Sequence, residues 1–210
     1  MNRFICCAAF CLFSFLMTAQ IIGINSKPID DQRYKDIKGS PYLFDDWQAA
    51  TVYKENGDVI ENAMVNYNAY EKTIEAKVKN GYVELSGDTY PKILLVKDSS
   101  YFAYNFHPKF KTQFARIHFV GEDYQFFSTT TSRINKRTIN NVGKTITLEN
   151  FANVTTYYLL QGEQLQPIKL KKKDLLALFP DKANVKFVKQ EQLKLNTAEE
   201  VVRFLEFAEN

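Results

Sequence analysis

The chain has 210 residues, of which 45% are hydrophobic and 24% charged, so it can bury a core, and the composition argues against global disorder. The length favours one domain or a small pair of domains. The formal net charge is only +3, so the bulk charge does not indicate a nucleic-acid binder.

Residues 1–19 have the pattern of a secretory signal peptide. Arg3 precedes an apolar run that ends at Met17, and the small Ala19 stands at the expected cleavage position. We therefore expect an exported protein, located in the periplasm, in the cell envelope or outside the cell. An uncleaved membrane anchor is the alternative, because isoleucines after Gln20 extend the apolar run toward membrane-spanning length.

All the cysteines of the chain lie inside this segment, at Cys6, Cys7 and Cys11. Cleavage therefore leaves a cysteine-free mature chain. Disulfides, thiolate nucleophiles and cysteine-based metal sites are then excluded from the mature protein. Its stability has to come from the core alone.

The region after the signal peptide divides into a polar N-terminal arm, residues 20–40, and a β domain, residues 41–170. Strands are predicted at Ala50–Tyr53, Val59–Val65, Thr73–Val78, Tyr82–Leu85, Lys92–Lys97, Ala115–Val120, Tyr124–Thr129, Thr145–Glu149 and Thr155–Leu160. Their spacing indicates a mostly antiparallel sheet, either a sandwich or an open curved sheet.

The clearest local prediction is a hairpin that turns at Asn80 and Gly81. This dipeptide favours the positive-φ backbone of a tight turn. In the strand before it, apolar residues alternate with Glu75 and Lys77, which we place on the opposite face from the core.

The last segment, residues 171–210, changes to a helical period. Lys172–Phe179 and Asp181–Gln192 read as short helices, and Thr197 with Glu200 forms a capping box before a third. We therefore predict an α+β fold in which two to three C-terminal helices pack on the sheet.

Three stretches carry a resemblance to known proteins. They are Lys38–Leu43, Val65–Tyr70 and the region from Tyr157 to Lys182, which includes the run Lys171-Lys172-Lys173. Together they resemble uncharacterised secreted proteins of Bacteroidota, which combine a signal peptide, a β-rich middle and a lysine-rich helical C-terminal tail. The resemblance implies an extracytoplasmic α+β protein and assigns no activity, cofactor or site residue.

The two histidines of the chain are the first candidates for chemistry. Strand alternation places His118 on the face opposite Ile117 and Phe119, so we expect its side chain to be exposed on the polar face of the strand. His107 precedes Pro108 at the end of a predicted strand, where a loop histidine competes with a role as base or ligand.

A second candidate site surrounds Trp47, the only tryptophan. Asp46 precedes it and Tyr42 lies just upstream, and such an acid-plus-aromatic cluster can bind sugars or cations. The competing interpretation is a polar turn beside a buried tryptophan. Tyr42, Asp46, Trp47 and His107 are therefore the candidate ligand-binding residues. We predict no catalytic residue, no metal site and no cofactor.

The sequence thus predicts a non-catalytic extracytoplasmic protein that binds a partner or ligand through a β surface. The partner would be an envelope protein, a glycan or a lipid, with no nucleic acid. Two alternatives remain open: a carrier or chaperone for apolar cargo, suggested by the many phenylalanines, and a hydrolase or lyase that uses carboxylates or tyrosines.

Overall fold

The computed structural model describes residues 26–141 and 144–209, so the predicted signal peptide lies outside the described residues. The elements in chain order are β1 (Ser26–Ile29), β2 (Gln48–Tyr53), β3 (Val59–Asn68), β4 (Thr73–Val78), β5 (Gly81–Leu85), β6 (Lys92–Leu95), β7 (Tyr101–Tyr104), the short 3-10 helix η1 (Pro108–Phe110), β8 (Phe114–Val120), β9 (Tyr124–Asn141), β10 (Lys144–Gln161), β11 (Gln164–Ile168), α1 (Lys172–Leu178), α2 (Lys182–Gln190) and α3 (Ala198–Ala208).

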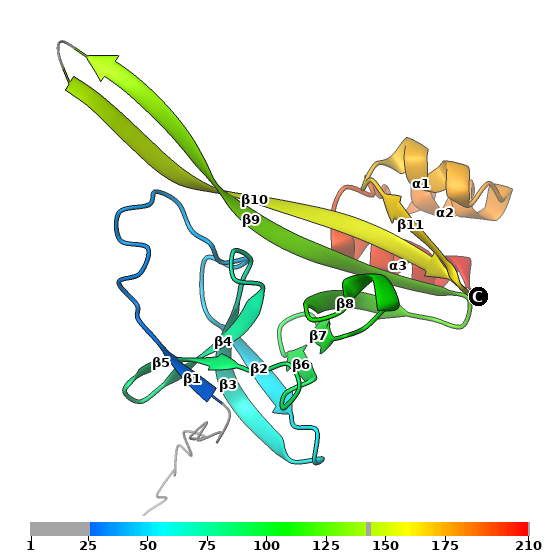
Figure 1. Cartoon of the computed structure of the whole chain (residues 1–210). Helices are drawn as coiled ribbons and strands as arrows, with labels where there is room; N and C mark the ends of the chain where they lie inside the picture. Colours follow the sequence, from blue (N-terminus) through cyan, green and yellow to red (C-terminus); the bar gives the residue numbers. More distant parts are fainter. Residues whose placement is uncertain (1–25, 142–143, 210) are drawn as a thin grey trace, which may run out of the picture.

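Within the described residues, the strands form one eleven-stranded open sheet in the order β1-β5-β4-β3-β2-β6-β7-β8-β9-β10-β11. All neighbouring strands run antiparallel. The three helices gather at one end of the long β9–β10 hairpin, and the other end of the hairpin extends away from the body (Figure 1). The predicted α+β class is confirmed, and the sheet takes the open form.

The local predictions for the hairpin and the helices are confirmed. β4 and β5 form the predicted hairpin, but its turn residues are Lys79 and Asn80, one position earlier than expected, because Val78 lies opposite Gly81, the first residue of β5. At the start of α3, Thr197 Oγ1 accepts a hydrogen bond from the Glu200 backbone N–H at 3.3 Å. These elements were predictable because turn and cap chemistry act over a few residues.

Two core clusters explain why the body of the sheet is well packed. The first is formed mainly by the strands from β2 to β8, where Tyr67 stacks on Phe102 with ring centroids 5.4 Å apart. The second joins the helices to the base of the hairpin, where Phe126 and Leu159 pack with Phe204 of α3. Burial of such apolar surface is the main stabilising contribution to both regions.

The base of the hairpin is buried on its opposite face as well. Successive strand residues point to opposite faces, so Phe127 faces away from the helices. There it meets Phe110 of η1, at a centroid distance of 5.6 Å, and stacks with Tyr158 at 5.2 Å. The hairpin is therefore clamped at its base between the helices and the η1 region.

The hairpin is longer than the sequence predicted. Its two strands have 18 residues each, whereas the predicted strands stopped at Thr129 in β9 and left a gap between Glu149 and Thr155 in β10. The predicted strand Thr145–Glu149 lies in the distal part of β10, so the main miss is β9 beyond Thr129. Residues 130–141 contain only two aliphatic residues, Ile134 and Ile139, so they lack the alternation of apolar and polar residues that marks a half-buried strand.

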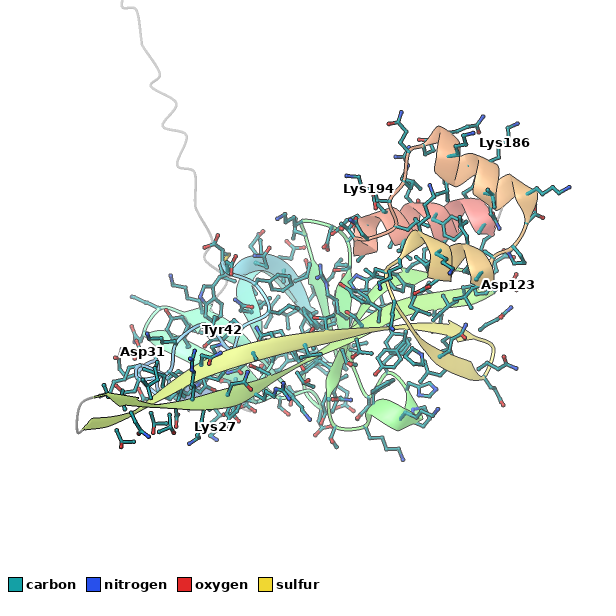
Figure 2. All side chains as sticks on the ribbon, turned by 90° about the horizontal axis from the view of Figure 1, so that it is seen from above. Lys27, Asp31, Tyr42, Asp123, Lys186 and Lys194 are labelled. Atoms are coloured by element: carbon teal, nitrogen blue, oxygen red, sulfur yellow. The ribbon has the colours of Figure 1, made fainter. Side chains whose placement is uncertain are left out.

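The segment predicted as a polar arm contains β1, which pairs with β5 at the edge of the sheet. Further along, the Lys38 N–H donates to the Glu149 carbonyl, and the Phe151 N–H donates to the Lys38 carbonyl, both at 2.9 Å. The arm therefore connects the first edge of the sheet to the middle of the hairpin, beside Tyr42 (Figure 2). In the part of the chain that the structure describes, no helix is long and apolar enough to cross a membrane.

Candidate binding sites

Tyr42, the first candidate residue, belongs to a buried polar network around Glu75. The Glu75 side chain is only 1% exposed because the N-terminal arm covers the charged face of β4. It forms an ion pair with Arg33, accepts a hydrogen bond from the Tyr42 hydroxyl at 2.8 Å and another from Asn68 Nδ2 at 2.7 Å. Burial and the negative charge of Glu75 both raise the pKa of Tyr42.

This network has a structural task. Arg33 lies in the arm and Tyr42 just after it, while Glu75 and Asn68 belong to the sheet. The contacts that Arg33 and Tyr42 make with Glu75 therefore hold the arm against the sheet. Tyr34 extends the connection, with its ring 5.2 Å from that of Phe151 in the hairpin. The arm, the sheet and the hairpin are thereby joined through polar and aromatic contacts, although the buried Arg33 Nε has no hydrogen-bond partner among the described residues.

Trp47 lies near Tyr42, as the sequence cluster suggested, but Asp46 does not join them in a polar site. The Trp47 ring stacks on Tyr82 with a centroid distance of 5.0 Å and lies 6.0 Å from the Tyr42 ring. The Asp46 side chain is exposed, and its backbone carbonyl accepts a hydrogen bond from Gln48. The carboxylate that Tyr42 contacts is therefore Glu75.

His107 lies in a different part of the molecule, at the start of η1. Its Nδ1 accepts a hydrogen bond from the Lys109 backbone N–H at 3.1 Å, and its ring lies 6.0 Å from that of Phe110. These contacts are those of a residue that caps a short helix. The structure thus brings Tyr42 and Trp47 together and leaves His107 apart.

The expectation that His118 is exposed on a polar face was wrong. A β-bulge between Ile117 and Phe119 leaves His118 as the extra residue of β8, and α3 covers this side of the sheet. Its Nε2 lies 2.9 Å from Ser128 Oγ, and its ring lies 5.1 Å from that of Phe126. Burial, helped by the charge of Arg116, lowers the pKa of His118 to about 3.

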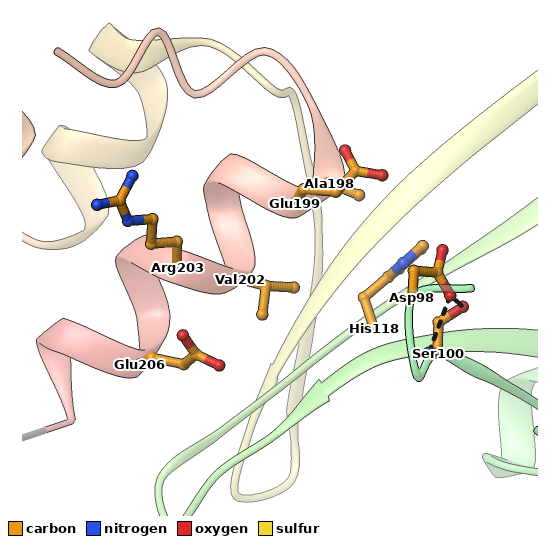
Figure 3. Close-up of a pocket in the computed structure, with 8 residues that line it drawn as sticks. All are labelled: Asp98, Ser100, His118, Ala198, Glu199, Val202, Arg203 and Glu206. Carbon is orange, nitrogen blue, oxygen red and sulfur yellow. Dashed lines mark hydrogen bonds between the residues drawn. The ribbon is translucent and has the colours of Figure 1, made fainter. Parts of the chain in front are cut away.

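His118 forms part of the wall of a pocket between α3 and the sheet (Figure 3). The pocket has a volume of about 380 Å³. It is lined by Asp98, Ser100, His118, Ala198, Glu199, Val202, Arg203 and Glu206. No local sequence pattern predicts this pocket, because its lining residues come from the β6–β7 turn, β8 and α3, which are far apart in the sequence.

The polar side chains on the sheet side of this pocket are already engaged with one another. Asp98 accepts hydrogen bonds from Ser100 N at 3.0 Å and Ser100 Oγ at 2.7 Å, and it forms an ion pair with Arg116. Burial acts to raise the pKa of Asp98, but the hydrogen bonds and the Arg116 charge outweigh it and hold that pKa below its ordinary value. Ser128, the partner of His118, is only 3% exposed, so this Ser–His pair offers no accessible nucleophile.

Among the described residues, no group of three or more His, Cys, Asp or Glu side chains is placed to hold a metal ion.

The distal half of the hairpin is largely exposed and carries both apolar and charged side chains. We use the name outer face for one side of the strand pair. The side chains on this side come from alternate residues of both strands: Arg133, Asn135, Arg137, Ile139, Ile146, Leu148, Asn150, Ala152 and Val154. Ile139 lies directly opposite Ile146, and these side chains are 37% and 49% exposed. Val154, eight residues farther along β10, is 52% exposed, so three aliphatic side chains of the outer face lie in solvent.

Basic residues lie beside these aliphatic side chains. Residues 131–150 contain four basic residues and one acidic residue, a net charge of +3. The acidic residue, Glu149, is paired with Lys136 at 2.6 Å. Within residues 26–141 and 144–209, Arg133 and Arg137 have no ion-pair partner. The hairpin therefore presents uncompensated positive charge beside exposed aliphatic side chains.

No protein-family model matches the chain, and no match was found among curated proteins or solved structures.

Proposed function

We propose that the protein is an exported, non-catalytic binding protein that contacts a protein partner through the outer face of the β9–β10 hairpin. The observation that supports this most is the exposure of the aliphatic side chains of Ile139, Ile146 and Val154 on a strand pair that projects from the body (Figure 1). Soluble proteins keep exposed apolar surface small unless that surface serves for contact with a partner.

The way the hairpin is held also supports a binding role. Its base is clamped between the helices and η1, and its middle is tied to the arm through Phe151 and Lys38. A surface that is held in place before binding loses less conformational entropy when the partner arrives. The long hairpin is thus a positioned surface, with its distal end available to a partner.

The signal-like segment supports an extracytoplasmic setting. Its charged start, apolar run and small residue at position 19 are typical of exported proteins. We therefore place the partner in the cell envelope or outside the cell, as the sequence predicted.

Site-specific photo-crosslinking in the producing cell tests this proposal. A crosslinking amino acid is placed at Ile146 on the outer face or, as a matched control, at Val59, which is 48% exposed on β3. We expect a discrete protein adduct from position 146 and none of the same mass from position 59. Equal adducts from both positions, or none from position 146, would contradict a binding role for the hairpin.

A further inference from the structure

The backbone edge of β9 points to the way in which this surface recognises its partner. Resting on the function proposed above, we propose that the partner supplies an extended, acidic peptide segment that pairs as an additional strand with residues 134–140 of β9. The side chains of the added strand would then lie beside the exposed side chains of β9 on both faces of the sheet.

The pairing pattern of the hairpin shows which backbone groups this edge offers. In an antiparallel pair, the residues of every second pair direct their N–H and C=O groups away from the partner strand. The Ser132 N–H is directed away from β10, because it donates to the Ala69 carbonyl at 2.9 Å. By the same alternation, the N–H and C=O groups of Ile134, Lys136, Thr138 and Asn140 are directed outward from β9.

These outward groups have room for a strand. β8 pairs with β9 only as far as Ser128, and the Ala69 contact ends at Ser132. In the described part of the chain, no backbone hydrogen bond reaches the β9 edge beyond that point. The free stretch of seven residues spans roughly 23 Å at the usual rise of a strand, long enough for an added strand of average length.

The opposite edge of the hairpin is less suited to an added strand. On β10 the Lys38 backbone already bonds to Glu149 and Phe151, so the arm occupies the middle of that edge. β11 occupies its base by pairing with residues 157–161. The β9 edge is therefore the one that an incoming segment can use over several consecutive pairs.

The charges beside the β9 edge select the chemistry of that segment. An added strand would place its side chains directly beside those of Arg133 and Arg137 on the outer face. Both guanidinium groups lack an ion-pair partner in the described residues, so carboxylates at alternate positions of the added strand complement them. Ile139 on the same face favours an apolar side chain between or beyond these carboxylates.

The same charges disfavour a second copy of this chain as the occupant. Two β9 edges that paired with each other would bring Arg133, Lys136 and Arg137 of both copies together. Like charges opposite each other on a sheet destabilise the pairing, and basic residues on free edges are a common protection against self-association. The charge pattern therefore favours an acidic partner over a homodimer.

The inference can be tested on the purified mature protein with synthetic peptides. The probe is a blocked peptide that alternates glutamate and valine. The controls are a peptide that alternates lysine and valine, and the glutamate peptide with a central proline, which removes one ladder donor. Binding is measured by fluorescence anisotropy, and the site is located by amide hydrogen exchange.

We expect the glutamate peptide to bind and to slow exchange at the amides of Ile134, Lys136, Thr138 and Asn140. The lysine and proline peptides should bind at least about tenfold more weakly. The double variant Arg133→Glu and Arg137→Glu should weaken binding of the glutamate peptide by about tenfold or more. The matched charge change Lys172→Glu with Lys173→Glu, at exposed positions of α1, should leave it unchanged.

Equal binding of the glutamate and lysine peptides would overturn the inference, as would protection elsewhere than at the β9 edge or no binding of the glutamate peptide. Strand pairing between two copies of the chain, seen as a dimer whose formation protects the same amides, would overturn it too. A specific crosslink at position 146 combined with any of these results would leave the proposed function intact and reject only the strand-pairing mode.

Discussion

Gly121 and Glu209 lie so close together that a Cβ atom on Gly121 would overlap the Glu209 carboxylate. That carboxylate accepts hydrogen bonds from three backbone N–H groups in the β8–β9 turn, those of Glu122 and Asp123 at 3.1 Å and of Tyr124 at 2.9 Å. The end of α3 is thus fixed to the turn from which the long hairpin starts. A Cβ at this position would have to displace the Glu209 carboxylate from the turn.

We expect Glu209→Ala to lower the free energy of unfolding by about 2 kcal/mol, because three turn N–H groups lose a charged acceptor. Gly121→Ala should have a similar effect by displacing the same carboxylate. The control Glu199→Gln, on the same helix, should cost no more than about 0.5 kcal/mol. Urea unfolding measures all three, and a Glu209→Ala loss no larger than that of the control would refute this role.

The buried charge of Glu75 leads to a second prediction. Glu75→Gln leaves Arg33 without its ionic partner under the arm, so we expect a loss of about 3 kcal/mol in unfolding free energy. Glu61→Gln, an exposed carboxylate on β3, should change it by less than about 0.5 kcal/mol. Comparable chemical denaturation curves for the two variants would show that the Arg33–Glu75 contact does not hold the arm.

The pH dependence of stability gives a third prediction. Because the folded-state pKa of His118 is lowered to about 3, this histidine is protonated near pH 6.5 in the unfolded chain but stays neutral there in the folded chain. The contribution of this histidine is fully present above pH 6.5 and is lost as the pH falls toward 3, by up to about 1.4 kcal/mol per pH unit. Acidification therefore destabilises the fold through this group.

The measurement is the slope of unfolding free energy against pH between 6 and 4. His118→Gln removes the titrating group, so its slope should be smaller than that of the unchanged protein by up to about 1.4 kcal/mol per pH unit. His107→Gln, in the η1 cap, is the matched control and should keep the original slope. An unchanged slope in His118→Gln would show that this ring is protonated as easily in the folded state as in the unfolded one.

The distal hairpin should be dispensable for folding, which is a fourth prediction. Replacing residues 137–148 by an Asn-Gly turn joins Lys136 to Glu149, which face each other in the native ladder. None of the described side chains in this stretch belongs to a core cluster, so we expect Tm to change by less than about 4 °C. Loss of cooperative unfolding in this trimmed variant would mean that the hairpin end is part of the core.

Sequence patterns located the elements whose causes are local. The β4–β5 hairpin and the Thr197 cap depend on a few neighbouring residues. The cap lies where it was expected, and the turn lies one residue earlier, at Lys79–Asn80. The covering of Glu75 by the arm depends on residues more than 30 positions away, such as Arg33 and Tyr42. No alternation pattern within β4 could reveal that contact.

The candidate sites were harder to predict for two physical reasons. The bulge at His118 breaks the two-residue period on which its exposure was inferred, and α3, which covers it, is distant in sequence. Thr145–Glu149 of the distal hairpin was predicted, but β9 beyond Thr129 was missed because a largely exposed strand with few apolar residues shows no two-residue hydrophobic period. Its Ile139–Ile146 pair becomes meaningful only when the register is known.

The central claim, that the outer face of the hairpin is the binding surface, is tested most directly by competition. Purified mature protein, either complete or with residues 137–148 trimmed, is added in excess while the crosslink at position 146 is formed in envelope extract. We predict that the complete protein abolishes the adduct and that the trimmed variant leaves it at full yield. Equal suppression by both proteins would place the binding surface on the body and contradict the account.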